Sequence, residues 1–373
     1  MRIAIDGSIA QRRLGGISEY THQMLQALGE LKTSHEFFVL TTGVNDQALV
    51  PLPILPKNFH EVRLHLPQRL LNVGWRYLSW PPVTAWLPPV DLFWAPHFLA
   101  PAGRFKRLVV SIHDVIFLDY PEWFTPPDQT YFRLSLNRTL QRADQVITIS
   151  QATKEALVRH KLFEAKKIQV TPLAVTYETP GVQTQAALRQ QYNLPEKYLL
   201  MIGTIEPRKN TLRVLEAYER LVGTAVDVPP LVLAGRRGWL GPELETALAR
   251  PNLRGRVHTL GSFERAHRSA LLAGAEMLLF PSLAEGFGLP VLEGMAAGVP
   301  VITSNISSLP EVAGEAALLV DPQDTAAIAA GIKKLINDPE LRQSLATAGK
   351  KRAQLFTWKA TAQQTLAVFE EVV

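Results

Sequence analysis

The chain has 373 residues, of which 47% are hydrophobic and 20% charged, and it contains no cysteine. Its length exceeds what one hydrophobic core usually supports, so we expect two domains, and the lack of cysteine excludes disulfides and thiolate metal sites. The net charge of +5 fits an anionic ligand, an anionic membrane surface or simple solubility, whereas no zinc-finger, basic-zipper or RNA-recognition signature supports a nucleic-acid partner.

The first residues and the apolar runs bear on where the protein is found. The N-terminal segment MRIAIDGS lacks the long apolar core of a signal peptide. No run of about 20 apolar residues occurs, so we expect no membrane span. A cytoplasmic location follows as an expectation.

The first half of the chain alternates apolar runs with stretches of helical spacing. Arg2–Asp6 reads as a strand, and a loop with Gly15 and Gly16 leads from it into a helix with apolar positions from Ile17 to Leu28. Further strands are predicted at Glu36–Leu40, Asp91–Ala95, Leu108–His113, Gln145–Ser150 and Ile168–Ala174. Such alternation predicts a parallel, doubly wound sheet.

A second α/β pattern follows the segment Thr176–Ala186, which is predicted to be a linker. Strands are predicted at Tyr198–Gly203, Pro230–Ala234, Val257–Leu260, Met277–Pro281, Val299–Thr303 and Ala317–Val320. Helices are predicted at Asn210–Leu221, Gly241–Ala249, Glu264–Gly274, Pro290–Ala297 and Thr325–Asn337. The two domains are therefore placed at residues 1–176 and 187–357, and Trp358–Val373 is an amphipathic helix.

Glycine, proline and glutamate gather around the start of the helix at Pro290. A buried strand ends at Pro281, and the loop after it carries Glu285 and two glycines. Open α/β sheets bind ligands at such strand ends, and the free amides of a helix start favour phosphate or sugar oxygens. Glu285 and Glu293 can accept hydrogen bonds from hydroxyl groups. A nucleotide sugar suits this arrangement, and a plain helix N-terminus with well-placed acids is the alternative.

A basic loop follows the first strand of the second domain, with the sequence GTIEPRKN from Gly203 to Asn210. Arg208 and Lys209 can place two cations against a diphosphate. A solvated basic loop is the alternative.

Together these segments resemble the retaining GT-B glycosyltransferases of family four, whose E-x7-E region Glu285 and Glu293 match. The resemblance implies two Rossmann-like domains facing across a cleft, with the nucleotide in the second domain. It implies that Glu285 contacts the donor sugar and Glu293 the ribose hydroxyls. It also implies that Arg208 and Lys209 neutralise the leaving diphosphate in place of a metal. The amides around Phe287, Gly288 and Leu289 would contact the sugar or the diphosphate.

The resemblance extends to less specific positions. It places Gly15 and Gly16 against the diphosphate or near the acceptor, although an ordinary turn is the alternative. It places His113, at a strand end, near the donor sugar, although a core histidine is the alternative. Arg236 follows a later strand, near which the family contacts the base or the diphosphate, and Ser262 lies where the family brackets the base through backbone groups.

One position departs from the family pattern. Many relatives carry an arginine directly after the glycine of the basic loop, and this chain has Thr204 there. Arg208 and Lys209 would then carry more of the charge stabilisation.

The resemblance implies transfer of a hexose from a nucleotide-sugar donor with retention of configuration, without a metal or a further cofactor. The segments GTIEPRKN and AEGFGLPVLEGMAAGVPV resemble those of bacterial members that use GDP-mannose to build O-antigen or exopolysaccharide. UDP-glucose or another nucleotide sugar is the nearest alternative. Sugar-nucleotide epimerases and phosphorylases share the architecture, and a non-catalytic nucleotide-sugar-binding protein is a third class.

The acceptor side carries two further expectations. The family implies a glycan or polyprenyl-linked acceptor. The segment Arg63–Trp80 mixes basic, aliphatic and aromatic residues, which favours association with an anionic membrane at its cytoplasmic face. A packed helix whose arginines face water is the alternative. In relatives the final helix returns to the first domain, so Trp358–Val373 is expected to do the same.

Overall fold

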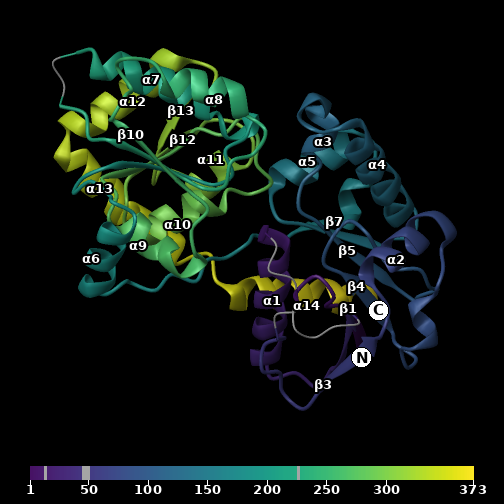
Figure 1. Ribbon diagram of the computed structural model, residues 1–373. Helices are drawn as coiled ribbons and strands as arrows, with labels where there is room; N and C mark the ends of the chain where they lie inside the picture. The colour runs from purple at the N-terminus through teal and green to yellow at the C-terminus, as the bar shows by residue number, and fades with distance from the viewer. Residues whose placement is uncertain (12–14, 44–50, 225–226) are drawn as a thin grey trace. The chain divides into compact units, whose positions relative to one another are not determined.

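The computed structural model describes residues 1–11, 15–43, 51–224 and 227–373. The chain forms two compact units, Met1–Leu173 with Thr357–Val373 as unit 1 and Ala174–Phe356 as unit 2 (Figure 1). Each unit is built on a sheet of parallel strands. The predicted class, α/β with two Rossmann-like domains, is confirmed.

In the described part of unit 1, strands form a seven-stranded sheet in the order β3-β2-β1-β4-β5-β6-β7. Their bounds are β1 (Arg2–Asp6), β2 (Glu36–Thr42), β3 (Phe59–Leu64), β4 (Leu92–Ala95), β5 (Leu108–Ile112), β6 (Gln145–Thr148) and β7 (Ile168–Val170). β2 and β3 lie on one side of β1, whereas β4 to β7 lie on the other. At such a reversal the loops that leave the two central strands diverge, and a crevice opens at their carboxyl ends.

The helices of unit 1 cover both faces of this sheet. Their bounds are α1 (Gly15–Glu30), α2 (Gln68–Val73) with a following π-helical turn (Gly74–Leu78), α3 (Ile116–Asp119), α4 (Pro126–Leu140), α5 (Gln151–Arg159) and α14 (Trp358–Val372). Adjacent residues of β4 show the two faces. Phe93 joins the core formed with α2, α4 and α5, whereas the ring of Trp94 lies 5.5 Å from that of Phe369 on α14. Full burial on both faces explains why β4 is a continuous apolar run.

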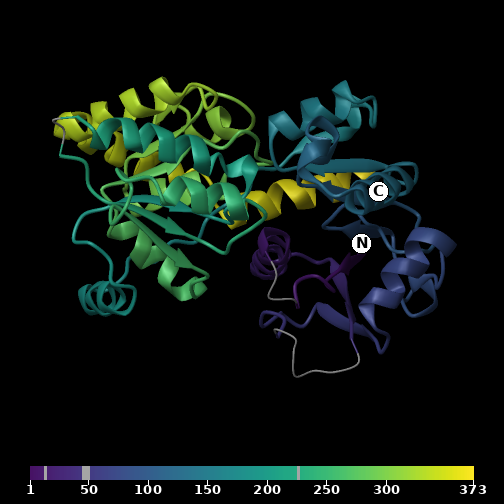
Figure 2. The same cartoon turned by 45° about the horizontal axis from the view of Figure 1, so that its top comes forward.

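The C-terminal helix α14 belongs to unit 1 although it follows unit 2 in the chain (Figures 1 and 2). It begins after Thr357, whose hydroxyl accepts a hydrogen bond from the amide of Ala360. Thr361 Oγ1 donates to the carbonyl oxygen of Pro172 at 2.8 Å. Near the other end, His35 Nε2 and Glu370 Oε1 are 3.0 Å apart.

In the described part of unit 2, strands form a six-stranded sheet in the order β10-β9-β8-β11-β12-β13. Their bounds are β8 (Leu199–Ile202), β9 (Leu231–Ala234), β10 (Val257–Gly261), β11 (Met277–Phe280), β12 (Val301–Ser304) and β13 (Leu318–Val320). The winding reverses between β8 and β11. The loops that follow these two strands are the basic loop and the Glu285 loop, so topology brings both predicted motifs to one switch point.

The helices of unit 2 form two layers, with α7, α8 and α12 on one face and α9, α10 and α13 on the other (Figure 1). Their bounds are α6 (Val182–Gln191), α7 (Thr211–Val222), α8 (Gly241–Leu248), α9 (Arg268–Ala273), α10 (Leu289–Ala297), α11 (Leu309–Ala313), α12 (Thr325–Asn337) and α13 (Pro339–Ala353). None of the helices in the described residues is long and apolar enough to cross a membrane.

Some elements differ from the sequence-based expectations. The linker prediction over Thr176–Ala186 is wrong from Val182 onward, because α6 begins there and its Gln, Ala and Leu residues are good helix formers. The edge strand β3 and helix α13 are not predicted from the sequence. Only Leu64 of β3 is buried, and the buried stripe of α13 is limited to Leu345, Gly349 and Ala353, so both lack a strong apolar period.

Candidate functional site

The loops after β8, β9 and β10 are held together by backbone hydrogen bonds. The amide of Gly203 donates to Ala234 O at 2.9 Å, and that of Ile205 donates to Arg236 O at 3.0 Å. The amide of Gly235 donates to Gly261 O at 3.0 Å. These bonds place the predicted residue Arg236 beside the basic loop, and Ser262, next to Gly261, beside the loop that follows β9.

This junction leaves no room for a side chain at Gly235. A Cβ added there would lie 1.8 Å from the carbonyl oxygen of Gly203. We expect Gly235→Ala to lower the free energy of unfolding by about 3 kcal/mol, because a backbone clash cannot be relieved by a rotamer change. Urea denaturation measures this. The control is Gly241→Ala, where nothing lies within 4 Å of the added carbon, and equal midpoints for the two variants would contradict the prediction.

The basic loop is also tied to the loop after β11. The amide of Leu283 donates to Arg208 O at 2.8 Å. Asn210, which is buried and has a left-handed φ of 63°, donates from Nδ2 to Pro281 O at 3.0 Å and to Pro322 O at 2.7 Å. Sequence reasoning did not assign Asn210 a role. The residue type itself could have indicated this position, because asparagine tolerates the left-handed region better than most residues.

Three predicted site residues form one ion cluster at this switch point. Glu285 Oε2 accepts from Arg208 Nη1 at 2.6 Å, and Glu285 Oε1 accepts from Lys209 Nζ at 2.5 Å. Glu206, which the sequence did not single out, accepts from Arg208 Nε at 3.0 Å and from Nη2 at 2.7 Å. The side chain of Glu285 is only 9% exposed, so the pairing takes place largely out of water.

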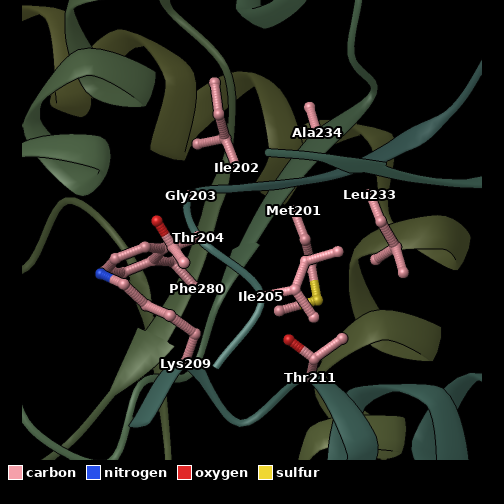
Figure 3. A pocket seen from close by; sticks show the side chains of 10 residues that line it. All are labelled: Met201, Ile202, Gly203, Thr204, Ile205, Lys209, Thr211, Leu233, Ala234 and Phe280. Carbon is pink, nitrogen blue, oxygen red and sulfur yellow. The ribbon is translucent and has the colours of Figure 1, made fainter. Parts of the chain in front are cut away.

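Lys209 lies against the end of the sheet (Figure 3). Its Nζ lies 4.5 Å from the centroid of the Phe280 ring, within range of a cation–π contact. A Cβ added at Gly203 would lie 3.6 Å from Lys209 Cε. The space between Lys209, Phe280 and Thr204 is part of a cavity of about 10 Å³, which is near the size needed for one water molecule.

Electrostatics keep Glu285 ionised. Burial by itself raises the pKa of this carboxyl, but the charges of Lys209 and Arg208 and the Lys209 hydrogen bond outweigh burial and hold the pKa below its ordinary value. Glu285 is therefore a carboxylate throughout the physiological pH range. A carboxylate has about four acceptor positions, so the two cations leave positions open for the hydroxyl groups of a ligand.

Two serines shape the turn from Glu285 to Phe287. Ser307 Oγ accepts from the amide of Glu285 at 3.0 Å and lies 2.9 Å from Glu285 O, to which it donates. Ser308 Oγ, which is fully buried, lies 2.9 Å from Glu285 O and 2.8 Å from Phe287 O. The sequence did not identify either serine, because they come from the loop after β12.

The start of α10 carries the predicted amide donors. Gly288 precedes the helix with φ of 109°, and a Cβ there would lie 2.6 Å from Leu309 Cδ2. The amides of Phe287, Gly288 and Leu289 form no hydrogen bond with the described residues. They are available, at the positive end of a helix dipole, for an anionic or hydroxyl-bearing ligand.

Glu293 lies one turn further into α10 and is paired. Its Oε2 accepts from Arg268 Nε at 2.7 Å and lies 2.5 Å from Arg268 Nη2. Arg268 is the first residue of α9 and was not identified from the sequence. The pair fixes the carboxylate while leaving its other oxygen open to a hydroxyl donor.

The two outer predicted residues of unit 2 are exposed. Arg236 has no ion-pair partner among the residues that the structure describes, whereas its neighbour Arg237 pairs with Glu245. Ser262 is also exposed. In the described part of the chain, no group of three or more His, Cys, Asp or Glu side chains is arranged to hold a metal ion.

In unit 1, His113 follows β5 and is held by the chain around it. Its Nε2 lies 2.8 Å from the carbonyl oxygen of Pro96, so Nε2 carries the proton and Nδ1 is left as an acceptor. The ring of Tyr20 packs edge-on at 4.7 Å. Burial lowers the pKa of His113 to about 4, so the ring is neutral at physiological pH.

Gly15 and Gly16 form the first turn of α1, in the same unit as His113. Both are exposed, Gly15 has φ of 77°, and a Cβ at either would meet nothing within 4 Å. The glycines thus leave the helix start open to solvent. Of the predicted site residues, unit 1 therefore holds Gly15, Gly16 and His113, and unit 2 holds the rest.

Comparison with known proteins shows the family of this chain. The family model of the glycosyl transferases group 1 matches residues 184–352, and that of Glycosyltransferase Family 4 matches residues 14–178. The chain is 34% identical to O-antigen chain mannosyltransferase B of Escherichia coli over 282 residues, which is 75% of this chain and 74% of that protein.

Solved structures share the fold at lower identity. Sucrose-phosphate synthase from Thermosynechococcus elongatus matches with a TM-score of 0.76 at 22% identity, covering 100% of this chain and 98% of that one. HepE from Anabaena, solved with UDP and glucose, matches with a TM-score of 0.72 at 19% identity, covering 100% of both chains. The predicted GT-B fold is thereby confirmed. With both family models and a relative of this identity in agreement, the chain belongs to the family 4 glycosyltransferases.

Proposed function

We propose that the protein transfers mannose from GDP-mannose, with retention of configuration, onto a glycan or polyprenyl-linked acceptor during polysaccharide synthesis. The observation that carries this proposal is the cluster of Arg208, Lys209 and Glu285 at the switch point of unit 2. The similarity to an O-antigen mannosyltransferase supports mannose as the sugar. The nearest alternative is a UDP-sugar donor, which is supported by the structural likeness to HepE, a protein solved with UDP and glucose.

The geometry of unit 2 suggests how the donor is held. Lys209 uses one of its three hydrogens on Glu285, so two remain for the diphosphate. Arg208 fixes Glu285 and adds its charge from the adjacent position. The open amides of Phe287, Gly288 and Leu289 complete an anion-binding surface at the start of α10.

The remaining polar groups would orient the two sugar rings and the base. The open acceptor positions of Glu285 take hydroxyls of the donor hexose, and Glu293, held by Arg268, takes the ribose hydroxyls. Arg236 and Ser262 lie at the ends of β9 and β10, where the base or the diphosphate would be in reach.

In the proposed reaction the bond between the anomeric carbon and the diphosphate oxygen breaks, and negative charge grows on that oxygen. Fixed cations stabilise this charge without reorganisation of solvent. The acceptor oxygen attacks from the same face and its proton passes to the departing phosphate. Neutral His113, with Nδ1 free to accept, would orient a sugar hydroxyl rather than act as a charged acid.

A thermal-shift panel with GDP, UDP, ADP and their sugar conjugates tests the donor. GDP and GDP-mannose are expected to raise the melting temperature most, because a ligand that binds only the folded state stabilises it. A larger shift with UDP compounds would replace GDP-mannose by a UDP-sugar. Absence of any shift would contradict nucleotide-sugar binding altogether.

Glu293→Ala is expected to weaken donor binding about tenfold, the effect of losing one charge-assisted hydrogen bond. Titration of GDP-mannose with the purified variant measures it. Glu340→Ala, an exposed acid in the first turn of α13, serves as the control. Unchanged donor affinity in Glu293→Ala would remove the ribose assignment.

We also propose that the protein works at the cytoplasmic face of an anionic membrane, which it contacts through the segment from Leu66 to Trp86. Residues 62–90 contain three arginines, Arg63, Arg69 and Arg76, and no acid. The exposed large apolar side chains of this segment are Leu66, Leu70, Val73, Tyr77, Leu78, Trp80 and Trp86. Apolar and aromatic side chains among cations are typical of a surface that enters the headgroup layer.

Liposome flotation tests this surface. Wild-type protein is expected to float with vesicles that contain anionic lipid, and the variant Leu70→Glu with Trp80→Glu to stay at the bottom. Leu355→Glu, at a residue that is 69% exposed in unit 2, should float like the wild type. Equal flotation of the double variant and the wild type would contradict the assignment.

A further inference from the structure

A second pocket lies in unit 1, at the switch point between β1 and β4. Its volume is about 130 Å³, and its lining includes Ser8, Gln68, Asn72, His97 and Tyr131. Since one water molecule needs roughly 10–15 Å³ on this measure, the pocket holds on the order of ten waters, comparable to one hexose. Its position follows the rule that open α/β sheets bind ligands where the strand order reverses.

His97, which lines this pocket, is paired with a buried carboxylate. Asp6, the last residue of β1, is fully buried, and its Oδ2 lies 3.2 Å from Nε2 of His97. Its Oδ1 accepts from the amide and the hydroxyl of Ser8 at 3.1 and 2.5 Å. The amide of Leu99 donates to His97 Nδ1 at 3.2 Å, which places the ring proton on Nε2.

The Asp6–His97 pair is therefore rigid and already satisfied. Burial raises the pKa of Asp6, but the hydrogen bonds from His97 and Ser8 outweigh burial and leave the pKa lowered. Both ring nitrogens of His97 have partners, so the ring lines the pocket without offering a hydrogen bond to a ligand. Ser8 Oγ donates to Asp6 and keeps its lone pairs for a ligand.

Helix α2 supplies amide groups to the same pocket. Gln68 Oε1 accepts from the hydroxyl of Thr42, and Gln68 Nε2 donates to Asn72 Oδ1 at 2.8 Å. This chain of bonds orients the Asn72 amide, whose NH₂ group has no partner among the described residues. A half-buried amide with two unused donors is suited to hydroxyl oxygens.

Two aromatic residues, Phe98 and Tyr131, also line this pocket. The Tyr131 ring centroid lies 3.7 Å from the Arg76 guanidinium and 5.8 Å from the Phe98 ring centroid, and the two rings are nearly perpendicular. The combination of aromatic rings with amide and hydroxyl groups matches a pyranose, which has apolar C–H faces and a rim of hydroxyls. Among the described residues that line the pocket, none is Asp, Glu, Lys or Arg.

We propose that this pocket binds an uncharged hexose unit of the acceptor, with Asn72 and Ser8 recognising its hydroxyl groups. The proposal rests on the proposed function, and it assigns the acceptor class as a glycan end that carries no phosphate on the bound ring. Asp6 and His97 are positioning residues, since Asp6 holds both Ser8 and His97 and neither residue has a free donor for the sugar.

Saturation-transfer NMR with methyl α-mannopyranoside tests the pocket directly. The wild type is expected to show transfer to the sugar protons at millimolar concentration, and Asn72→Leu to weaken binding about tenfold, as for one lost buried hydrogen bond. Asn137→Leu, an exposed residue of α4, should bind as the wild type does. Melting temperatures of all variants establish that they are folded.

The outcomes separate this proposal from the proposed function. Failure of the wild type to bind the methyl hexoside, together with normal stabilisation by GDP, would overturn the pocket assignment and leave the transferase proposal standing. Displacement of the methyl hexoside by GDP alone would also overturn it, because the sugar would then lie in the nucleotide site. Tighter binding of mannose 6-phosphate than of the methyl hexoside would overturn the uncharged acceptor class.

Discussion

Replacing Arg208 and Lys209 together by alanine is expected to lower kcat at least about 10³-fold, because removing even one preorganised donor to a developing anion costs about 10²–10³. Lys209 should account for most of the loss. Its side chain is 13% exposed and its ammonium group keeps two hydrogens for the leaving diphosphate, whereas Arg208 is occupied by Glu206 and Glu285.

The measurement is steady-state turnover of the donor that the thermal-shift panel identifies, alongside the dissociation constant of its nucleotide diphosphate. A leaving-group role predicts that kcat falls by a larger factor than nucleotide affinity, because the charge being stabilised grows in the transition state. The matched control is Lys166→Ala with Lys167→Ala, an adjacent basic pair that contacts Glu164 at the surface. Near-normal turnover in the Arg208/Lys209 variant would reject the leaving-group role.

Glu285→Gln is expected to reduce both turnover and stability. The variant removes the carboxylate charge that pairs with buried Lys209 and with Arg208. Breaking a buried ion pair by removing one member costs about 3 kcal/mol or more. Urea denaturation at pH 7 measures this loss. Glu245→Gln removes the partner of exposed Arg237 and should change stability by less than about 1 kcal/mol.

The difference in the free energy of unfolding between wild type and Glu285→Gln should become smaller as the pH falls. Because the folded-state pKa of Glu285 lies below the ordinary value of 4.5, the carboxylate stabilises the folded state fully above pH 4.5. This contribution is lost as the pH falls through the lower folded-state pKa. The two proteins should therefore converge in acid. A difference that grows as the pH falls would contradict the assignment.

Several features could be predicted from the sequence because they depend on local patterns. Strands such as β4 and β11 are buried on both faces, so each is a continuous apolar run that needs no knowledge of its neighbours. The glycines and acids of the segment from Glu285 to Glu293 are likewise adjacent in the chain. Local signals failed at α6, β3 and α13, where burial is shallow and the apolar period is weak.

The pairing of site residues could not be read in the same way. Arg208 and Glu285 are 77 residues apart, Arg268 and Glu293 are 25 apart, and Asp6 and His97 are 91 apart. Each pair depends on which strands or helices become neighbours. Strand order is decided by how the whole sheet buries its two faces. It therefore cannot be read from the sequence of any single segment.

By itself, the sequence determined the fold class, the family and the short list of chemically capable residues, because apolar periodicity and contiguous motifs are local properties. Only the tertiary structure decided that Glu285 is held as a carboxylate by two cations and that Glu293 is fixed by Arg268. It also decided that unit 1 has a polar pocket lined by Ser8, Asn72 and His97. The physical reason is that charge pairing and cavity shape arise where the loops of non-adjacent strands meet at a switch point of the sheet.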